Sequence, residues 1–285
     1  MGCDVVGVAT APAPAAMLKR VASTVVLVPL FAWVVVAAPV WVFPLLVVAA
    51  SGVAAWELAR MFERAKRPVY TWLGVALAAA VTGAFASAAP GVVPAYPTLA
   101  LALAIGLVLS APVWAGVVPS TEAPANTLLG VTYVGWLLGF AILLHGLPQG
   151  PWLVIFLMAV TWVGETAAYL VGSLVGRRRL APTLSPGKTL EGSAAQIVAS
   201  ILTAVLLERW LLPGCGRTVA LAAGGLIGVV GQIGDLAESA IKRSVGTKDT
   251  SQIIPGHGGV LDRIDSLLFN IPMFYGYIAV MGCAR

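Results

Sequence analysis

Residues 151–174 read Pro-Trp-Leu-Val-Ile-Phe-Leu-Met-Ala-Val-Thr-Trp-Val-Gly-Glu-Thr-Ala-Ala-Tyr-Leu-Val-Gly-Ser-Leu, an apolar run with one charged side chain, Glu165. A transmembrane helix needs about 20 predominantly apolar residues to cross the hydrocarbon core of a bilayer. This run is therefore long enough to span a membrane. Hydrophobic residues make up 59% of the 285-residue chain, which predicts a polytopic α-helical membrane protein without a separate soluble domain.

Similar apolar runs, separated by polar or Pro/Gly-rich breaks, recur along the chain. They predict an all-α integral membrane protein with about nine spans, at residues 21–38, 40–58, 71–88, 97–117, 126–146, 151–174, 193–212, 218–241 and 265–283. Residues 1–16 are rich in Ala and Pro and are predicted to be a disordered extension, and residues 17–285 to be one membrane-embedded domain. The first span resembles a secretory signal, but its apolar run is too long and lacks a cleavage site, so we interpret it as uncleaved.

The placement of basic residues predicts the orientation. If the amino terminus is cytoplasmic, all but three of the 17 Lys and Arg residues face the cytoplasm, the exceptions being Arg209, Arg217 and Arg285. The positive-inside rule favours this orientation. We therefore expect a protein of the inner (cytoplasmic) membrane whose two long polar loops, 175–192 and 242–264, face the cytoplasm. The net charge of +5 then reflects topology rather than binding of nucleic acid.

The span at 218–241 ends in a polar stripe. On a helix, Asp235, Glu238, Ser239 and Lys242 share one face. Ionisable side chains inside a span are costly, so they usually face a water-filled cavity or a partner, and they indicate a functional site. A purely structural salt bridge between Asp235 or Glu238 and a lysine is the alternative.

The loop after this span combines acidic and basic side chains. Asp249, Asp262 and Asp265 offer the hard oxygen atoms that Mg²⁺ prefers. The basic residues of the same segment, which could bind phosphate, are Lys242, Arg243, Lys248 and Arg263. This combination indicates a Mg²⁺–phosphate site. A loop that only touched anionic lipid headgroups would account for the basic residues but not for the three aspartates.

Glycines surround the one histidine of this loop, His257. Gly256, Gly258 and Gly259 would let the backbone approach a ligand closely and would leave amide donors free for phosphate oxygens.

The other long loop contains Ser185-Pro-Gly-Lys-Thr-Leu-Glu-Gly192, in which Lys188 is a phosphate candidate. The Gly-Lys-Thr triplet imitates the end of a P-loop, but the first required glycine would fall at Pro182, so we exclude that motif. Ser185 followed by proline also fits the start of a helix, in which case Ser185 would only be a cap. Glu165, inside its span, is either a site residue or the partner of a lysine.

Residues 239–265 follow the pattern Ser-x-Ile-Lys-Arg-x4-Lys-Asp-x-Ser-x2-Ile-Pro-x-His-Gly-Gly-Val-x-Asp-Arg-Ile-Asp. This pattern closely resembles the signature of bacterial phosphatidate cytidylyltransferases, also called CDP-diacylglycerol synthases. Gly234-Asp235-Leu236 and the segment 185–192 resemble the other motifs of that family. The chain departs from the family at Glu165, where an aspartate is usual, and at Gly187, which replaces a common lysine.

The resemblance implies transfer of CMP from CTP to phosphatidate, with Mg²⁺ as cofactor and room for a second metal or a monovalent cation. It implies Asp235 and Asp262 as metal ligands, with Asp249 and Asp265 as further ligands. The residues expected to act on phosphates in catalysis are Lys188, Lys242, Arg243, Lys248, Arg263 and His257. Those expected to bind substrate are Ser185, Thr189, Glu191, Ser239, Gly258 and Gly259. The implied partners are CTP, phosphatidate, membrane lipids and a second copy of the chain in a homodimer.

Two other classes of function stay open at this point. A cation or proton transporter would also carry acidic residues within its spans, but it leaves the charged loop unexplained. An enzyme that transfers a cytidylyl or phosphoryl group to another lipid would need much of the same phosphate chemistry.

Overall fold

The structure, a computed structural model, describes residues 28–87, 95–115, 120–212, 214–248, 250–251 and 258–282. Its helices after residue 40 are α2 (Val42–Arg64), α3 (Thr71–Ala84), α4 (Ala95–Ala115), α5 (Glu122–Gly130), α6 (Leu137–Gly146), α7 (Gly150–Val175), α8 (Leu190–Leu211), α9 (Arg217–Ser244) and α10 (Leu261–Met281). A 3₁₀ turn, Phe85–Ser87, extends α3, and a π-helical segment, Val131–Trp136, joins α5 to α6. Residues 28–36 are also helical.

The helices confirm the prediction of a multi-span protein. Each predicted span coincides with helix, although the first is described only from residue 28 and is helical over residues 28–36. In the described part of the chain, seven helices are long and apolar enough to cross a membrane, and Thr71–Ser87 is a shorter apolar helix. Large apolar side chains such as Leu174, Leu206 and Val280 lie exposed on the bundle, as they would where lipid covers the protein. The predicted orientation, the extension at residues 1–16 and the single domain stay predictions.

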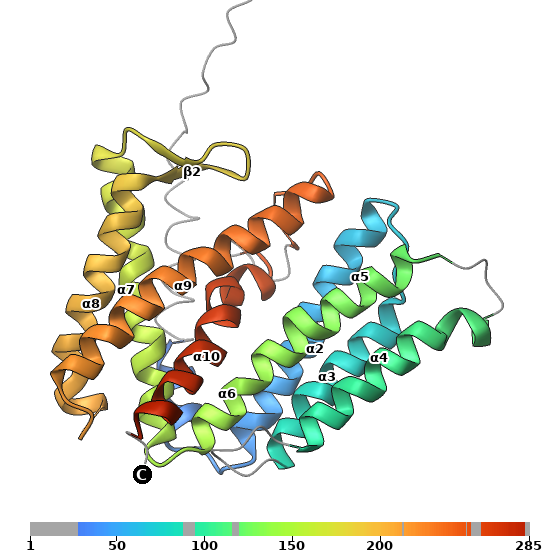
Figure 1. Ribbon diagram of the computed structural model, residues 1–285, viewed down its shortest axis with the longest axis horizontal. Helices are drawn as coiled ribbons and strands as arrows, with labels where there is room; N and C mark the ends of the chain where they lie inside the picture. Colours follow the sequence, from blue (N-terminus) through green and yellow to red (C-terminus); the bar gives the residue numbers. More distant parts are fainter. Residues whose placement is uncertain are drawn as a thin grey trace, which may run out of the picture.

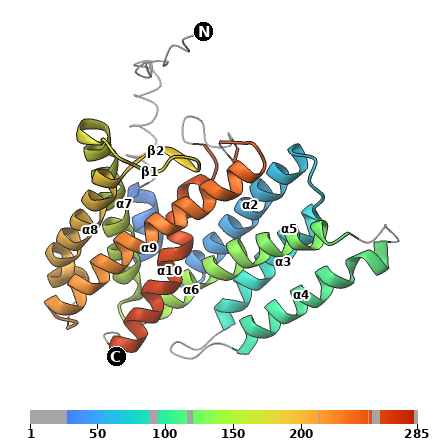
Figure 2. The same cartoon turned by 45° about the horizontal axis from the view of Figure 1, so that its top comes forward.

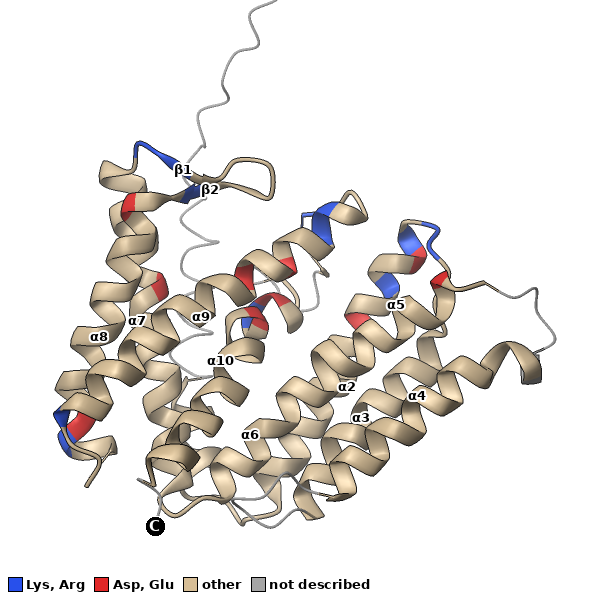
Figure 3. Ribbon diagram, viewed as in Figure 1, with Lys and Arg blue, Asp and Glu red and all other residues tan. Residues whose placement is uncertain are grey.

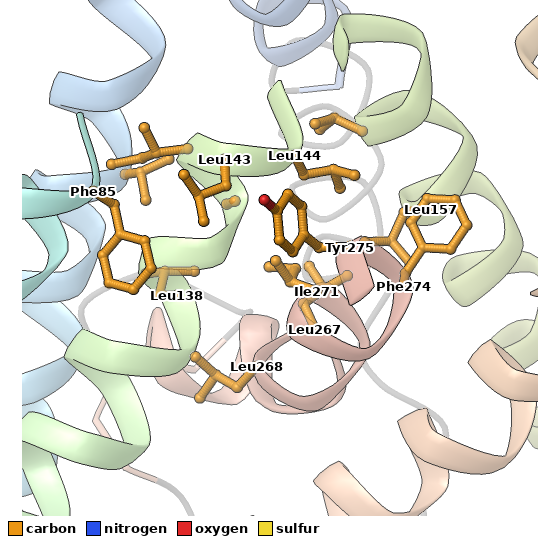
Figure 4. Packing of buried hydrophobic residues seen from close by; sticks show 14 of the residues in the cluster. Phe85, Leu138, Leu143, Leu144, Leu157, Leu267, Leu268, Ile271, Phe274 and Tyr275 are labelled. Carbon is orange, nitrogen blue, oxygen red and sulfur yellow. The ribbon is translucent and has the colours of Figure 1, made fainter. Parts of the chain in front are cut away.

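The helices form two groups joined by a crossing pair (Figures 1 and 2). One group holds α7 and α8, the other α2 to α6, and α9 and α10 pack between them. Close packing of α9 on α8 depends on Gly224, where an added Cβ would lie 2.6 Å from the Cα of Ile201. Buried apolar side chains of α6, α7 and α10 fill the centre, including Leu144, Leu157 and Phe274 (Figure 4).

The prediction of an all-α fold is wrong at one place. The loop between α7 and α8 contains an antiparallel hairpin of β1 (Arg179–Ala181) and β2 (Ser185–Thr189), with Arg179 opposite Thr189 and Ala181 opposite Ser185. Pro186 lacks an N–H group, which an edge strand tolerates and a helix interior does not. Ser185 therefore lies in a strand and does not start a helix.

Helix α8 begins instead at the end of this hairpin. Thr189 is its N-cap, and the hydroxyl oxygen of Thr189 accepts a hydrogen bond from the amide of Gly192 at 3.1 Å. The hairpin and the start of α8 are thus one continuous unit, which fixes where Lys188 points.

Most charged residues lie toward one end of the bundle (Figure 3). The hairpin, the end of α9, the start of α10 and the end of α2 lie toward that end, whereas the α8–α9 connection, the segment of Arg209 and Arg217, lies at the opposite end. The residues singled out as a candidate site lie at the charged end.

Candidate active site

The first part of the site is an ion pair between the hairpin and α9. Lys188 Nζ lies 2.5 Å from Asp235 Oδ2, and the two side chains are 24% and 33% exposed. Both residues line a cavity of about 560 Å³ between the hairpin, α7, α8 and α9. Glu165 of α7 lines the same cavity, so the structure brings three of the singled-out residues to one partly open space.

A buried polar contact forms part of the cavity wall. The Ser193 hydroxyl donates to the side-chain oxygen of Gln232, whose Nε2 donates to the Ser193 carbonyl at 3.1 Å and to the Gly228 carbonyl at 3.0 Å. These bonds tie α8 to α9 beneath Lys188 and Asp235. The cavity wall is therefore held by polar contacts as well as by apolar packing.

The second part of the site lies two turns further along α9. Lys242 forms ion pairs with Glu238 on its own helix and with Asp262 at the start of α10, where Nζ lies 3.0 Å from Oδ1. The other carboxylate oxygen of Asp262 accepts hydrogen bonds from the Thr250 hydroxyl at 2.8 Å and the Gly259 amide at 2.9 Å. Asp262 is thereby fixed in orientation by three groups.

Acidic side chains crowd between these two ion pairs. Asp265 lies close enough to Asp235, Glu238 and Glu165 for their charges to repel its own. The Ser266 amide donates to Asp265 at 2.7 Å. One oxygen of Glu238, Oε1, is buried and accepts no hydrogen bond within the described part of the chain. Such a concentration of carboxylates suits a cation or the positive groups of a ligand.

The donor set fits Mg²⁺ in its chemistry. Carboxylate oxygens are hard ligands, and Glu238 Oε1 is a buried oxygen that still lacks a partner. Over the residues that the structure describes, no three His, Cys, Asp or Glu side chains converge closely enough to hold a metal ion by themselves. Protein sites for Mg²⁺ commonly supply one or two carboxylates and leave the remaining positions to water and substrate phosphates.

The remaining predicted catalytic and binding residues have different surroundings. Arg243 connects α9 to the hairpin turn, since its Nε donates to the Leu184 carbonyl at 3.2 Å. Ser239 donates weakly to Asp235, at 3.5 Å. Lys248 and Arg263 are exposed at the charged end. Asp249 and His257 lie outside the described residues, as does Gly256.

Two predicted substrate-binding groups bind the protein itself. Glu191 accepts hydrogen bonds from the amides of Arg177, at 3.1 Å, and Arg178, so it closes the base of the hairpin. The amide of Gly259 donates to Asp262 and so does not stand free for a phosphate. Gly258 has a φ of 82°, and an added Cβ there would lie 2.9 Å from Asp262 Oδ2. These glycines make room for side chains of the protein.

The salt-bridge alternative is confirmed as a contact, because Asp235 and Glu238 each pair with a lysine. Those pairs neutralise charges that would otherwise be unpaired. These ion pairs do not exclude a role in ligand binding. When a pair separates, the lysine can bind a phosphate and the carboxylate can bind a cation.

One residue of the site was missed by sequence reasoning. Glu57 of α2 is fully buried, and it accepts hydrogen bonds from Ser251 and from the amides of Val260 and Leu261 at the start of α10. The available signal was a lone acidic residue inside the apolar run 40–58. The partners of that residue, about 200 positions away, leave no trace in the local pattern.

Comparison with known proteins shows which sequences this chain resembles. A family model described as "Cytidylyltransferase family" matches residues 18–281. The chain is 41% identical over 152 residues to "Uncharacterized protein YnbB" of Escherichia coli K12, which covers 53% of this chain and 50% of that protein. It is 37% identical over 149 residues to a phosphatidate cytidylyltransferase of Staphylococcus epidermidis RP62A, covering 52% and 56% respectively. A phosphatidate cytidylyltransferase of Staphylococcus aureus COL is 34% identical over the same length. The chain spans about half the length of the curated relatives that it matches.

Proposed function

Because the chain belongs to the cytidylyltransferase family, we propose that it transfers CMP from CTP to phosphatidate, giving CDP-diacylglycerol and pyrophosphate. The relatives named phosphatidate cytidylyltransferase support this choice of acceptor. The proposed setting is the inner membrane, with the site facing the cytoplasm. The candidate spans and the gathering of basic residues at the site's end of the bundle support that setting (Figure 3).

The observation that carries the proposal is the pair of lysine–carboxylate contacts on α9. Lys188 of β2 pairs with Asp235 of α9, and Asp262 of α10 pairs with Lys242 of α9. Asp235 and Lys242 lie seven residues apart on that helix. At 1.5 Å per residue, the two centres are separated by about 10 Å along α9. Two phosphate-bearing molecules can be held side by side at that spacing, next to a cavity at the end of the bundle.

The proposed reaction needs charge control more than proton transfer. An anionic phosphate oxygen of phosphatidate attacks the α-phosphorus of CTP, the bond between that phosphorus and the bridging oxygen breaks, and pyrophosphate leaves with the electron pair. The attacking oxygen is already charged, so no general base is required. The obstacle is the approach of two polyanions, which positively charged groups must offset.

Lys188 and Lys242 are proposed to release their carboxylate partners and contact phosphate oxygens, with Arg243, Lys248 and Arg263 nearby. Asp235 and Asp262 would then be available to hold Mg²⁺, assisted by Asp265. When bound, Mg²⁺ supplies charge neutralisation and alignment of the phosphates. Asp249 and His257 stay in the proposal on the resemblance alone, as does the homodimer.

The test is an assay of the purified protein with labelled CTP, phosphatidate and Mg²⁺, in which labelled CDP-diacylglycerol is expected. A panel of other lipid phosphates and lipid alcohols as acceptors distinguishes this reaction from related transfers. If no labelled lipid forms where a control enzyme works, the proposal is wrong. Ion uptake by sealed proteoliposomes without CTP would favour a transporter instead.

A further inference from the structure

Glu57 joins two parts of the molecule that are far apart in sequence. Its Oε1 accepts hydrogen bonds from the Ser251 hydroxyl at 2.5 Å and the Val260 amide at 3.0 Å, and its Oε2 accepts one from the Leu261 amide at 2.8 Å. The side chain is fully buried. A buried carboxylate is stable only when hydrogen bonds or a cation replace its hydration, and here three donors from the start of α10 and the segment before it do so.

Helix α10 lacks a cap of its own. Its N-cap residue is Val260, which makes no side-chain capping bond. The first amides of a helix have no partner within the helix, and they attract negative charge. Glu57 supplies from α2 the oxygen atoms that Ser, Thr, Asp or Asn would supply at an ordinary N-cap.

The same turn of chain fixes Asp262. Asp262 lies in the first turn of α10, and it accepts hydrogen bonds from Gly259 and Thr250. Gly259 lies between the two carboxylates. An added Cβ there would lie 2.7 Å from Glu57 Oε2 and 2.2 Å from Thr250 Oγ1. A shift of Glu57 would therefore be transmitted directly to the backbone that orients Asp262.

We propose that Glu57 is a positioning residue, which holds the start of α10 so that Asp262 faces Lys242. It touches neither proposed substrate; it acts through the amides of Val260 and Leu261. The consequence for catalysis rests on the proposed function, whereas the consequence for the backbone does not.

The test replaces Glu57 with glutamine, which has nearly the same shape. Its amide group offers one acceptor oxygen, and its NH₂ group is a donor that would face other donors. Hydrogen exchange in residues 258–262, followed by mass spectrometry, is expected to become at least about 10-fold faster, because hydrogen bonds to a charged acceptor are lost. The kcat of CMP transfer is expected to fall by about 10- to 100-fold, the usual range for groups that orient metal ligands. The Mg²⁺ concentration for half-maximal rate is expected to rise several-fold.

Ser51→Ala is the matched control. Ser51 is a fully buried polar residue of the same helix, and it accepts a hydrogen bond from Thr82 of α3 at 2.8 Å rather than from α10. Ser51→Ala is expected to leave both the exchange of residues 258–262 and the Mg²⁺ dependence unchanged. An effect of Ser51→Ala equal to that of Glu57→Gln would mean that any polar loss in α2 suffices, which would overturn the proposal.

Hydrogen exchange and activity, measured together, distinguish a failure of this proposal from a failure of the proposed function. If the wild-type protein makes no CDP-diacylglycerol, the proposed function fails, and exchange still decides whether Glu57 holds α10. Unchanged exchange at residues 258–262 in Glu57→Gln overturns the proposal. Faster hydrogen exchange with unaltered kcat and Mg²⁺ dependence also overturns the proposal.

If Glu57→Gln does not fold, Ser251→Ala is the second variant. It removes a single donor to Glu57, and a smaller change in the same direction is expected. Unchanged hydrogen exchange and Mg²⁺ dependence in Ser251→Ala contradict the proposal.

Discussion

At the scale of single residues, the acidic groups of α9 and α10 have different surroundings. Asp235 is 33% exposed beside a cavity and has one lysine partner, while Asp262 is 10% exposed and held by Lys242, Thr250 and Gly259. Asp235 can therefore exchange its partner more easily. Asp262 is held rigidly and suits a role that needs fixed geometry.

Asparagine at either position is expected to abolish CMP transfer. Asp235→Asn and Asp262→Asn each remove one negative charge with little change in volume, so they weaken binding of a cation without creating a cavity. Membrane insertion and expression should stay as in the wild type, and radiolabelled product formation is the measurement. Turnover like that of the wild type in either purified variant would show that the residue is not a metal ligand.

Alanine at Gly259 is expected to destabilise the protein. The added Cβ would meet Thr250 Oγ1 at 2.2 Å and the Glu57 carboxylate at 2.7 Å. Overpacking of this kind destabilises by about 1–3 kcal/mol. Thermal unfolding in detergent measures the effect. Gly276→Ala, near the other end of α10, is the control, because a Cβ there meets nothing within 4 Å. Equal midpoints for the two variants would contradict the close contact.

At the scale of elements, the hairpin and α8 act as one unit. Strand β2 ends at Thr189, and the next residue begins the helix, so Lys188 sits one residue before a capped helix start. Thr189 also packs against Gly176 at the end of α7, where an added Cβ would lie 2.6 Å from Thr189 Cγ2. The position of Lys188 thus depends on the junction of three elements.

Valine at Thr189 isolates the capping bond. Thr189→Val keeps the methyl group that packs on Gly176 and loses the hydroxyl oxygen that accepts from Gly192. Loss of an N-cap costs about 0.5–2 kcal/mol. The unfolding midpoint is expected to fall in Thr189→Val and to fall less in Thr189→Ser, which keeps the hydroxyl. If the midpoint fell further in Thr189→Ser than in Thr189→Val, packing of the methyl group rather than the capping bond would be the source of the stability.

At the scale of the whole molecule, the charged end of the bundle is expected to face the cytoplasm (Figure 3). In a protein whose three cysteines are replaced by serine, Arg178→Cys, immediately before the hairpin, should react with a membrane-impermeant thiol reagent only when the cytoplasmic face is accessible. Arg217→Cys, at the opposite end, should react from outside. Labelling of both from one side would exclude the proposed orientation.

The sequence by itself determined the spans, because insertion into a bilayer depends mainly on the length and apolarity of each run. It also singled out the polar stripe of α9 and the charged loop, since ionisable residues are conspicuous among apolar ones. It did not predict the hairpin, whose strands of 3 and 5 residues are too short to show a periodicity.

Only the tertiary structure decided which charges meet. Lys188 pairs with Asp235 because the hairpin folds over α9, and Glu57 caps α10 because α2 packs beside it. Such partners lie tens to hundreds of residues apart, and many pairings of basic and acidic residues satisfy the same local pattern. Packing of the helices selects one of them, because a buried carboxylate must meet donors wherever the fold brings it.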